Sequence, residues 1–191
     1  MNRAPVAVVI GAGDATGSAV AKRFAREGFT LCVTRRTVEK LETLVSDIEA
    51  AGGVVKPFGC DARVEQEMVE LFAHIEKDIG PIEVVVFNIG ANVHFSILDT
   101  TERVYRKVWE MGALAGFLTG REAAKVMIPR ERGTIIFTGA TASLVLSLLC
   151  GHWHKAWRAS WDLKAYMSHT LSLTVLLILI LFVTTFLSAM S

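Results

Sequence analysis

Apolar positions along the chain follow two alternating patterns. Short runs rich in β-branched residues are separated by longer segments in which apolar residues recur every three or four positions. The short runs are typical of strands buried on both faces, and the longer segments are typical of amphipathic helices. The expected strands are residues 6–10, 30–34, 54–58, 82–87 and 133–138. Residues 101–127 predict the longest helix.

Regular alternation of strand and helix with short connections predicts an α/β fold. Parallel strands joined by right-handed helical crossovers form a doubly wound sheet with helices on both faces. We therefore expect a parallel sheet that is truncated after its fifth strand, within a domain of residues 1–143. With 191 residues, the chain is long enough to form one such domain around a hydrophobic core.

The hydrophobic pattern changes after residue 143. Residues 144–170 form a connector with Trp153, Trp157 and Trp161 among basic residues, and residues 171–190 carry no ionisable side chain. About 20 apolar residues can span a bilayer as a helix, and Trp and basic residues are common at its interface. The tail therefore predicts a C-terminal transmembrane helix that anchors a cytoplasmic domain. A second interpretation is an apolar translation product that packs on the exposed sheet edge or aggregates.

Charge and cysteine content exclude several classes of protein. Lys and Arg number 20 against 19 Asp and Glu, so the chain lacks the concentrated positive charge of a nucleic-acid-binding protein. The three cysteines are widely spaced and odd in number, which favours a reducing compartment over a disulfide framework. Cys150, His152 and His154 are too few to form a structural metal site, so we expect no metal.

A glycine-rich turn joins the first expected strand to the first expected helix. The backbone of such a turn can approach a phosphate closely, and the helix N-terminus offers free N–H groups and the positive end of its dipole. This context predicts a Rossmann-type dinucleotide-binding domain, and the alternative is a purely structural turn. The candidate cofactor-binding residues of the turn are Gly11, Gly13, Ala15, Thr16 and Gly17.

Two further motifs follow the third and fourth expected strands. They are Asp61-Ala62 and Phe87-Asn88-Ile89-Gly90. Together with the glycine turn, they resemble the motifs of the short-chain dehydrogenase/reductase family over about residues 5–143. By this resemblance, Asp61 and Ala62 contact the adenine of the cofactor. Asn88 and Gly90 match the family's Asn-Asn-Ala-Gly motif and join the set of cofactor-binding residues.

The resemblance also assigns the positions within the glycine turn. The family's turn reads Gly-x-x-x-Gly-x-Gly, and its glycines fall on Gly11, Ala15 and Gly17. Alanine therefore replaces the middle glycine, a tolerable departure that we expect to alter the affinity for the cofactor.

The resemblance implies a nicotinamide dinucleotide, and the end of the second expected strand indicates which one. Arg35 and Arg36 stand where an NAD-selective site usually has an acid that accepts from the ribose 2′-OH. An arginine can instead bind a 2′-phosphate bidentately. We therefore expect NADP(H) in preference to NAD(H), unless these arginines are simply a solvated loop start.

The residues that complete the family's reaction are missing from this sequence. In that family a tyrosine protonates the substrate oxygen, a lysine four positions later lowers its pKa, and a serine holds the oxygen. Neither Tyr105 nor Tyr166 is followed by such a lysine. Ala140 stands where the serine is expected, and Ala113 stands near the position of an assisting asparagine. We therefore predict no catalytic residue.

Three functional interpretations follow from these observations. The first, by resemblance, is an NADP(H)-dependent oxidoreductase for an alcohol or carbonyl substrate that is inactive in this truncated form. The abrupt change after residue 143 then indicates an alternative exon or a change of reading frame. The second is a non-catalytic, membrane-anchored nucleotide-binding or interaction protein, which the missing Tyr-x-x-x-Lys pair favours. The third is a product that cells degrade.

Overall fold

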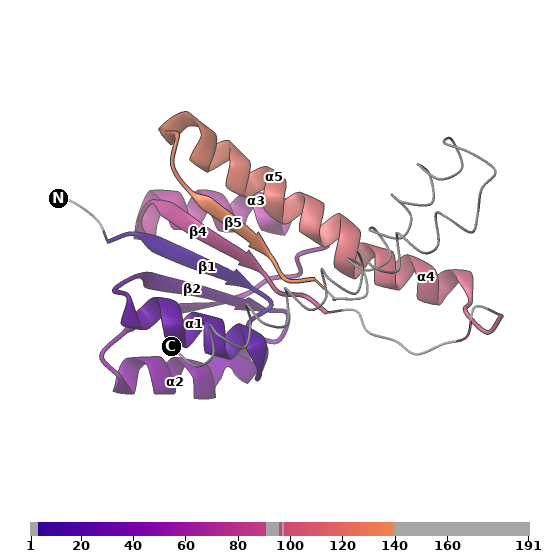
Figure 1. The fold of residues 1–191 in the computed structure, drawn as a ribbon, viewed down its shortest axis with the longest axis horizontal. Helices are drawn as coiled ribbons and strands as arrows, with labels where there is room; N and C mark the ends of the chain where they lie inside the picture. Colours follow the sequence, from indigo (N-terminus) through magenta and orange to yellow (C-terminus); the bar gives the residue numbers. More distant parts are fainter. Residues whose placement is uncertain (1–3, 91–95, 97, 140–191) are drawn as a thin grey trace, which may run out of the picture. The chain divides into compact units, whose positions relative to one another are not determined.

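One parallel β-sheet organises the described part of the chain. The computed structural model describes residues 4–90, 96 and 98–139. Its strands are β1 (Val6–Ile10), β2 (Thr30–Arg35), β3 (Val54–Gly59), β4 (Ile82–Phe87) and β5 (Thr134–Phe137). They are all parallel and lie in the order β3-β2-β1-β4-β5 (Figure 1). The strand order reverses between β1 and β4, which is the doubly wound arrangement that the strand–helix alternation predicts.

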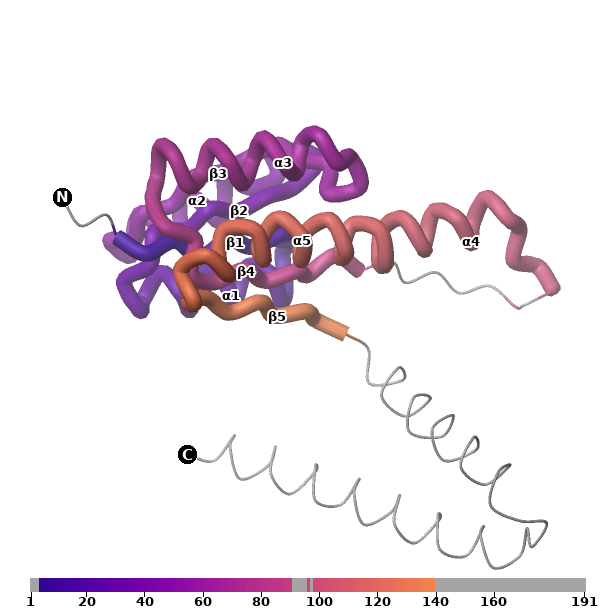
Figure 2. The backbone as a smooth tube through the Cα atoms, turned by 90° about the horizontal axis from the view of Figure 1, so that it is seen from above, coloured from indigo at the N-terminus to yellow at the C-terminus, as the bar shows by residue number. Residues whose placement is uncertain are grey.

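Helices cover both faces of this sheet. On one face lie α1 (Thr16–Arg26) and α2 (Glu42–Ala50), and on the other lie α3 (Glu65–His74) and α5 (Ala115–Met127) (Figures 1 and 2). Helix α4 (Glu102–Trp109) extends beyond the sheet and buries none of its residues. The shorter helical turns are η1 (Val38–Leu41), η2 (Ile75–Ile79), η3 (Glu110–Leu114) and η4 (Ile128–Arg130).

Strand β1 is the centre of the hydrophobic core. All five of its residues are fully buried, because helices cover both of its faces. Val6, Val8 and Ile10 pack in the cluster beneath α3 and α5, whereas Ala7 and Val9 pack in the cluster beneath α1 and α2. Burying one Val or Ile side chain contributes about 1.5–3 kcal/mol. Both clusters therefore hold the carboxyl end of β1 firmly in place.

The structure confirms the predicted parallel α/β sheet and interrupts one predicted helix. Residues 101–127, expected as a single helix, form α4, the π-helical turn η3 and α5. Gly112 lies within η3. Glycine weakens a regular α-helix and so favours such a local change of winding at this point.

The predicted C-terminal segments lie outside the described residues. These are the connector of residues 144–170 and the apolar segment of residues 171–190, together with the predicted domain boundary at residue 143. Among residues 4–90, 96 and 98–139, no helix combines the length and the apolar character needed to cross a bilayer. The transmembrane helix therefore stays a prediction from the sequence.

Candidate functional site

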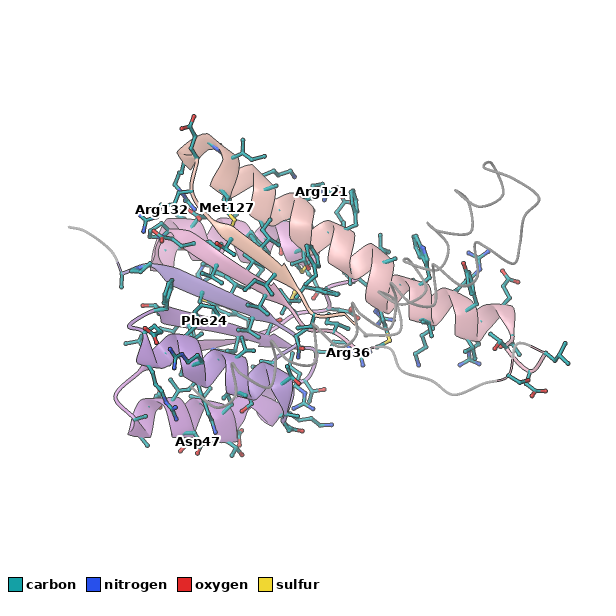
Figure 3. All side chains as sticks on the ribbon, in the orientation of Figure 1. Phe24, Arg36, Asp47, Arg121, Met127 and Arg132 are labelled. Atoms are coloured by element: carbon teal, nitrogen blue, oxygen red, sulfur yellow. The ribbon has the colours of Figure 1, made fainter. Side chains whose placement is uncertain are left out.

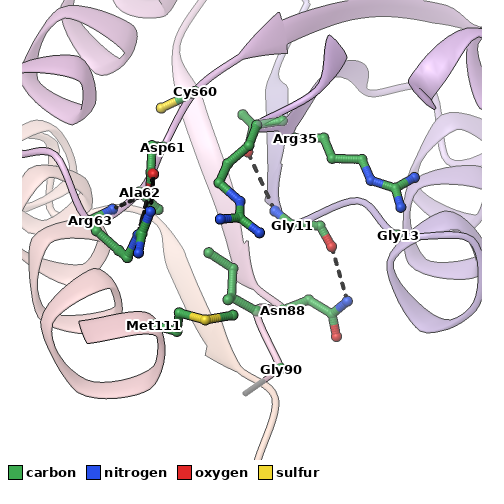
Figure 4. Close-up of a pocket in the computed structure, with 13 residues that line it drawn as sticks. Gly11, Gly13, Arg35, Cys60, Asp61, Ala62, Arg63, Asn88, Gly90 and Met111 are labelled. Carbon is green, nitrogen blue, oxygen red and sulfur yellow. Dashed lines mark hydrogen bonds and ion pairs between the residues drawn. The ribbon is translucent and has the colours of Figure 1, made fainter. Parts of the chain in front are cut away.

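A pocket of about 200 Å³ opens at the carboxyl ends of β1, β2, β3 and β4. This is the point where the strand order reverses, and open α/β sheets bind ligands at such a point. The close-up in Figure 4 shows the side chains that converge there from the four strand ends. The lining residues are Gly11, Gly13, Thr34, Arg35, Arg36, Cys60, Asp61, Ala62, Arg63, Asn88, Ile89, Gly90 and Met111.

Eight of the predicted site residues line this pocket, and the other three stand at the start of α1. The lining eight are Gly11, Gly13, Arg35, Arg36, Asp61, Ala62, Asn88 and Gly90. Ala15 and Thr16 are exposed, whereas Gly17 is buried. Ala15 occupies the N-cap position of α1 but its side chain caps nothing. The first turn of α1 therefore presents backbone N–H groups without a side-chain partner, as an anion site requires.

Backbone geometry requires glycine at two positions of the turn. Gly11 has φ of +83°, and a Cβ there would meet the carbonyl oxygen of Asn88 at 2.8 Å. A Cβ on Gly17 would meet the carbonyl oxygen of Gly11 at 2.7 Å. Gly13 differs, because its Cβ would meet nothing within 4 Å. The turn thus leaves open space beside Gly13 at the pocket wall, which fits a ligand that approaches the backbone closely.

The alanine that replaces the middle glycine of the turn fits the backbone. Ala15 has φ of −108°, outside the left-handed region that favours glycine. A glycine is therefore not required at this position for the turn to form.

The side chain of Asn88 joins three strand ends. Its Nδ2 donates to the carbonyl oxygen of Gly11 at 3.2 Å, as the dashed line in Figure 4 shows. Its Oδ1 accepts from the hydroxyl of Thr138 at 3.1 Å, just after β5. The same hydroxyl also lies 3.1 Å from the carbonyl oxygen of Phe87, so its one hydrogen is shared between the two oxygens. Asn88 therefore positions the glycine turn relative to β4 and β5, and sequence reasoning missed Thr138 because its partners lie far away along the chain.

An ion pair forms the wall of the pocket after β3. Arg63 donates to both carboxylate oxygens of Asp61, with Nη2 to Oδ2 at 2.6 Å and Nε to Oδ1 at 2.9 Å (Figure 4). The hydrogen bond from Arg63 holds the pKa of Asp61 below its ordinary value. Ala62, which lies between them in the sequence, is buried. Sequence reasoning missed Arg63, although a basic residue two positions after Asp61 is a signal for such a pair.

The two arginines at the end of β2 have different surroundings. The Nη1 of Arg35 lies 2.9 Å from Oδ1 of Asp14, in the glycine turn. Within the described residues, the guanidinium of Arg36 has no carboxylate partner at ion-pair distance, although its charge contributes to lowering the pKa of Asp61. Of the two arginines, Arg36 is therefore the one whose charge is not paired with a carboxylate of the described residues.

The thiol in the pocket is not suited to nucleophilic chemistry. Burial raises the pKa of Cys60 to about 12, and its Sγ contacts the Sδ of Met68 at 3.7 Å. A thiol with this pKa is almost entirely protonated near neutral pH, and the thiolate is the reactive form. Tyr105 lies on α4 and does not line the pocket, and Ala140 and Tyr166 lie outside the described residues.

Known proteins share this sequence pattern and this architecture. A family model for the short chain dehydrogenases matches residues 5–151. The chain belongs to the short-chain dehydrogenase family. That family is one of oxidoreductases that bind a nicotinamide dinucleotide.

Curated short-chain dehydrogenases and reductases match much of this chain. The 2,3-dihydro-2,3-dihydroxybenzoate dehydrogenase of Bacillus subtilis is 28% identical over 138 residues, which cover 72% of this chain and 53% of the relative. The 3-oxoacyl-[acyl-carrier-protein] reductase of Bos taurus is 29% identical over 139 residues, which cover 73% of this chain and 57% of the relative. The chain thus spans about half the length of the curated relatives it matches.

Solved structures of short-chain dehydrogenases share the fold. One from Rhodopseudomonas palustris is 52% identical with a TM-score of 0.67, over 73% of this chain and 66% of that one. An actinorhodin polyketide ketoreductase with NADPH is 26% identical with a TM-score of 0.68, over 74% of this chain and 58% of that one. A metagenomic short-chain oxidoreductase in complex with NADP is 26% identical with a TM-score of 0.63, over 71% of this chain and 62% of that one.

Proposed function

We propose that the described domain binds NADP(H) and that these 191 residues alone do not complete hydride transfer to a carbonyl substrate. The observation that carries the first part is one pocket lined by three arginines and by the glycine turn that leads into the uncapped N-terminus of α1. Backbone N–H groups and arginines are the protein's usual ligands for phosphates. When bound, the nicotinamide cofactor supplies the hydride chemistry.

Each predicted residue has a specific part in this proposal. The pyrophosphate lies against the turn of Gly11, Gly13, Ala15, Thr16 and Gly17. Arg35 and Arg36 face the 2′-phosphate, and Asp61 with Ala62 faces the adenine. Asn88 and Gly90 complete the pocket, with Asn88 holding the turn through the carbonyl oxygen of Gly11.

The preference for NADP(H) over NAD(H) rests on charge at the end of β2. Three guanidinium groups line the pocket; Asp61 pairs with Arg63 and Asp14 with Arg35, so the charge of Arg36 stays unpaired among the described residues and attracts a phosphate with a charge of about −1.5 to −2. Arg36 is the stronger candidate, because it has no ion-pair partner within the described residues. The ketoreductase solved with NADPH and the oxidoreductase solved with NADP support the same choice.

Proton transfer is the part of the reaction for which we propose no residue. A carbonyl oxygen that accepts a hydride also needs a proton, and an unassisted tyrosine near pKa 10 is a poor acid at neutral pH. The sequence has no Tyr-x-x-x-Lys pair, and Tyr105 on α4 does not line the pocket. We therefore infer that this chain binds the cofactor without turnover. The proposed substrate class is an alcohol or a carbonyl compound.

The alternative is a membrane-anchored nucleotide-binding or interaction protein without catalysis. It is favoured by the missing Tyr-x-x-x-Lys pair and by the composition of residues 171–190, which lie outside the described residues. Both functions require the dinucleotide pocket, so the first test addresses that pocket.

A substitution at the N-cap of α1 tests nucleotide binding without endangering the fold. In Ala15→Asp, the carboxylate caps α1 and is expected to stabilise it by about 0.5–2 kcal/mol. The same negative charge opposes the pyrophosphate, so the affinity for NADPH and for NADH should fall at least about tenfold. Ala51→Asp, at the exposed C-cap of α2, is the matched control and should leave both affinities unchanged. Equal nucleotide affinities in the parent chain and Ala15→Asp, measured by nucleotide fluorescence, would contradict the proposed site.

A further inference from the structure

An acid in the glycine turn lies against one of the arginines proposed to bind phosphate. The Oδ1 of Asp14 is 2.9 Å from Nη1 of Arg35, and the same Nη1 lies 3.3 Å from the carbonyl oxygen of Lys40. The Asp14 side chain is 84% exposed, whereas that of Arg35 is 27% exposed. Arg35 is thus held between the turn and the segment after β2, while the side chain of Asp14 remains largely exposed to solvent.

This contact changes the electrostatics that a 2′-phosphate would meet. The carboxylate of Asp14 neutralises the charge of Arg35 and takes one of its N–H donors. An incoming phosphate must displace Asp14 or bind beside it, and both arrangements bring two negative groups together. A nucleotide with a free ribose 2′-OH brings no phosphate to Arg35, and its pyrophosphate lies against the backbone of the turn. The presence of Asp14 therefore affects the two nucleotides unequally.

We propose that Asp14 is a specificity-determining residue that competes with the 2′-phosphate for Arg35. It lowers the affinity for NADPH, leaves that for NADH largely unchanged, and makes Arg36 the main partner of the phosphate. This inference rests on the proposed function, because it requires that the pocket binds the dinucleotide.

A structural role for the same ion pair makes a different prediction. Exposed ion pairs contribute little to stability, and Asp14 is almost fully exposed. If the pair only braced the turn, its loss would change the binding of both nucleotides alike or of neither. The ratio of the two affinities separates the roles.

The test is a double-mutant cycle on the complete 191-residue chain. The parent chain, Asp14→Asn, Arg35→Gln and the double variant are titrated with NADPH and with NADH at low ionic strength, where charge effects are largest. Asp14→Asn should tighten NADPH binding about tenfold and change NADH binding less than twofold. In the Arg35→Gln background, the same substitution should change NADPH binding less than about threefold, because Asp14 acts through Arg35.

Matched variants keep this result interpretable. Asp47→Asn breaks the exposed ion pair between Asp47 and Lys22 on α2 and α1, away from Arg36 (Figure 3). It removes the same charge and should leave the ratio of the two affinities unchanged. Asp14→Ser repeats the test with a smaller side chain, and raising the salt concentration should shrink the gain in NADPH affinity.

The outcomes separate this inference from the function on which it rests. An equal change for both nucleotides, or no change in Asp14→Asn, overturns the role of Asp14 alone. Selective weakening of NADH also overturns it, because Asp14 would then accept from the ribose hydroxyl. If no variant, including the parent, shows saturable binding of either nucleotide, the proposed function fails and this inference fails with it.

Discussion

At the scale of single residues, the pocket depends on small groups held at short range by the backbone. A Cβ at Gly11 or Gly17 would overlap backbone atoms of the turn or of Asn88. Asn88 in turn holds Gly11 through its amide. The two arginines at the end of β2 differ in their charge partners. Arg35 is paired with Asp14, whereas Arg36 has no ion-pair partner among the described residues.

The two arginines should therefore contribute unequally to binding of the 2′-phosphate. Arg36→Gln should weaken NADPH binding by about 1.5–3 kcal/mol, the range for a hydrogen bond to a charged group. Arg35→Gln should weaken NADPH binding less, because Nη1 of Arg35 already donates a hydrogen bond to Asp14. Calorimetric titration of each variant with NADPH and NADH measures the effect. Arg106→Gln, which breaks an exposed ion pair on α4, is the control. A larger loss for Arg35→Gln than for Arg36→Gln would reverse our assignment.

At the scale of elements, the turn between β3 and α3 illustrates what the sequence could and could not predict. Its Asp-Ala pair follows a strand that the apolar pattern predicts, and the structure places Asp61 after the carboxyl end of β3, in the lining of the pocket. The partner Arg63 depends on how the turn folds back on itself, which periodicity does not describe. The ion pair between Asp14 and Arg35 joins residues 21 positions apart, so it required the strand register as well. Likewise, the π-helical winding of η3 around Gly112 was not predictable from the apolar spacing of residues 101–127.

The ion pair of this turn should make stability depend on pH in acid. The pKa of Asp61 is lowered in the folded state, so its contribution is present above the unfolded pKa of about 3.9 and is lost as the pH falls through the folded pKa. Arg63→Met should therefore cost about 1–2 kcal/mol of unfolding free energy at pH 7. The difference from the parent should shrink below about pH 4, where Asp61 of the unfolded chain becomes protonated, and should be lost as the pH falls through the lower folded pKa. Urea denaturation from pH 3 to 7 tests this, and a difference that stays constant or grows in acid would contradict it.

At the scale of the whole molecule, the described sheet places four strand ends around the pocket and leaves β5 with exposed apolar side chains. Ile136 and Phe137 are 40% and 53% exposed. The family and the fold of this part follow from local patterns that the sequence carries plainly, namely strand–helix alternation and a glycine turn between β1 and α1. The apolar run of residues 171–190 carries no such alternation, and its composition fits a bilayer, a protein surface or an aggregate.

A membrane assay distinguishes these fates of the tail. If residues 171–190 span a bilayer, a tagged chain should stay with the membrane pellet after carbonate extraction. Leu177→Arg with Leu181→Arg should release it, because each arginine costs about 2.5–3.5 kcal/mol near the bilayer centre. Loss of the parent from the membrane, or pelleting of both proteins without membranes, would identify the tail as a non-spanning segment.

The central claim is that this chain contains a working cofactor pocket without the groups that complete the reaction. A single stopped-flow record of NADPH fluorescence, taken with excess chain and a panel of carbonyl compounds, tests both parts at once. We predict a rapid, saturable change on binding and then no decay above background, since loss of general acid catalysis alone slows such a reaction about 10²–10⁴-fold. Absence of the binding signal, or a decay whose rate rises with the concentration of the chain, would contradict the claim.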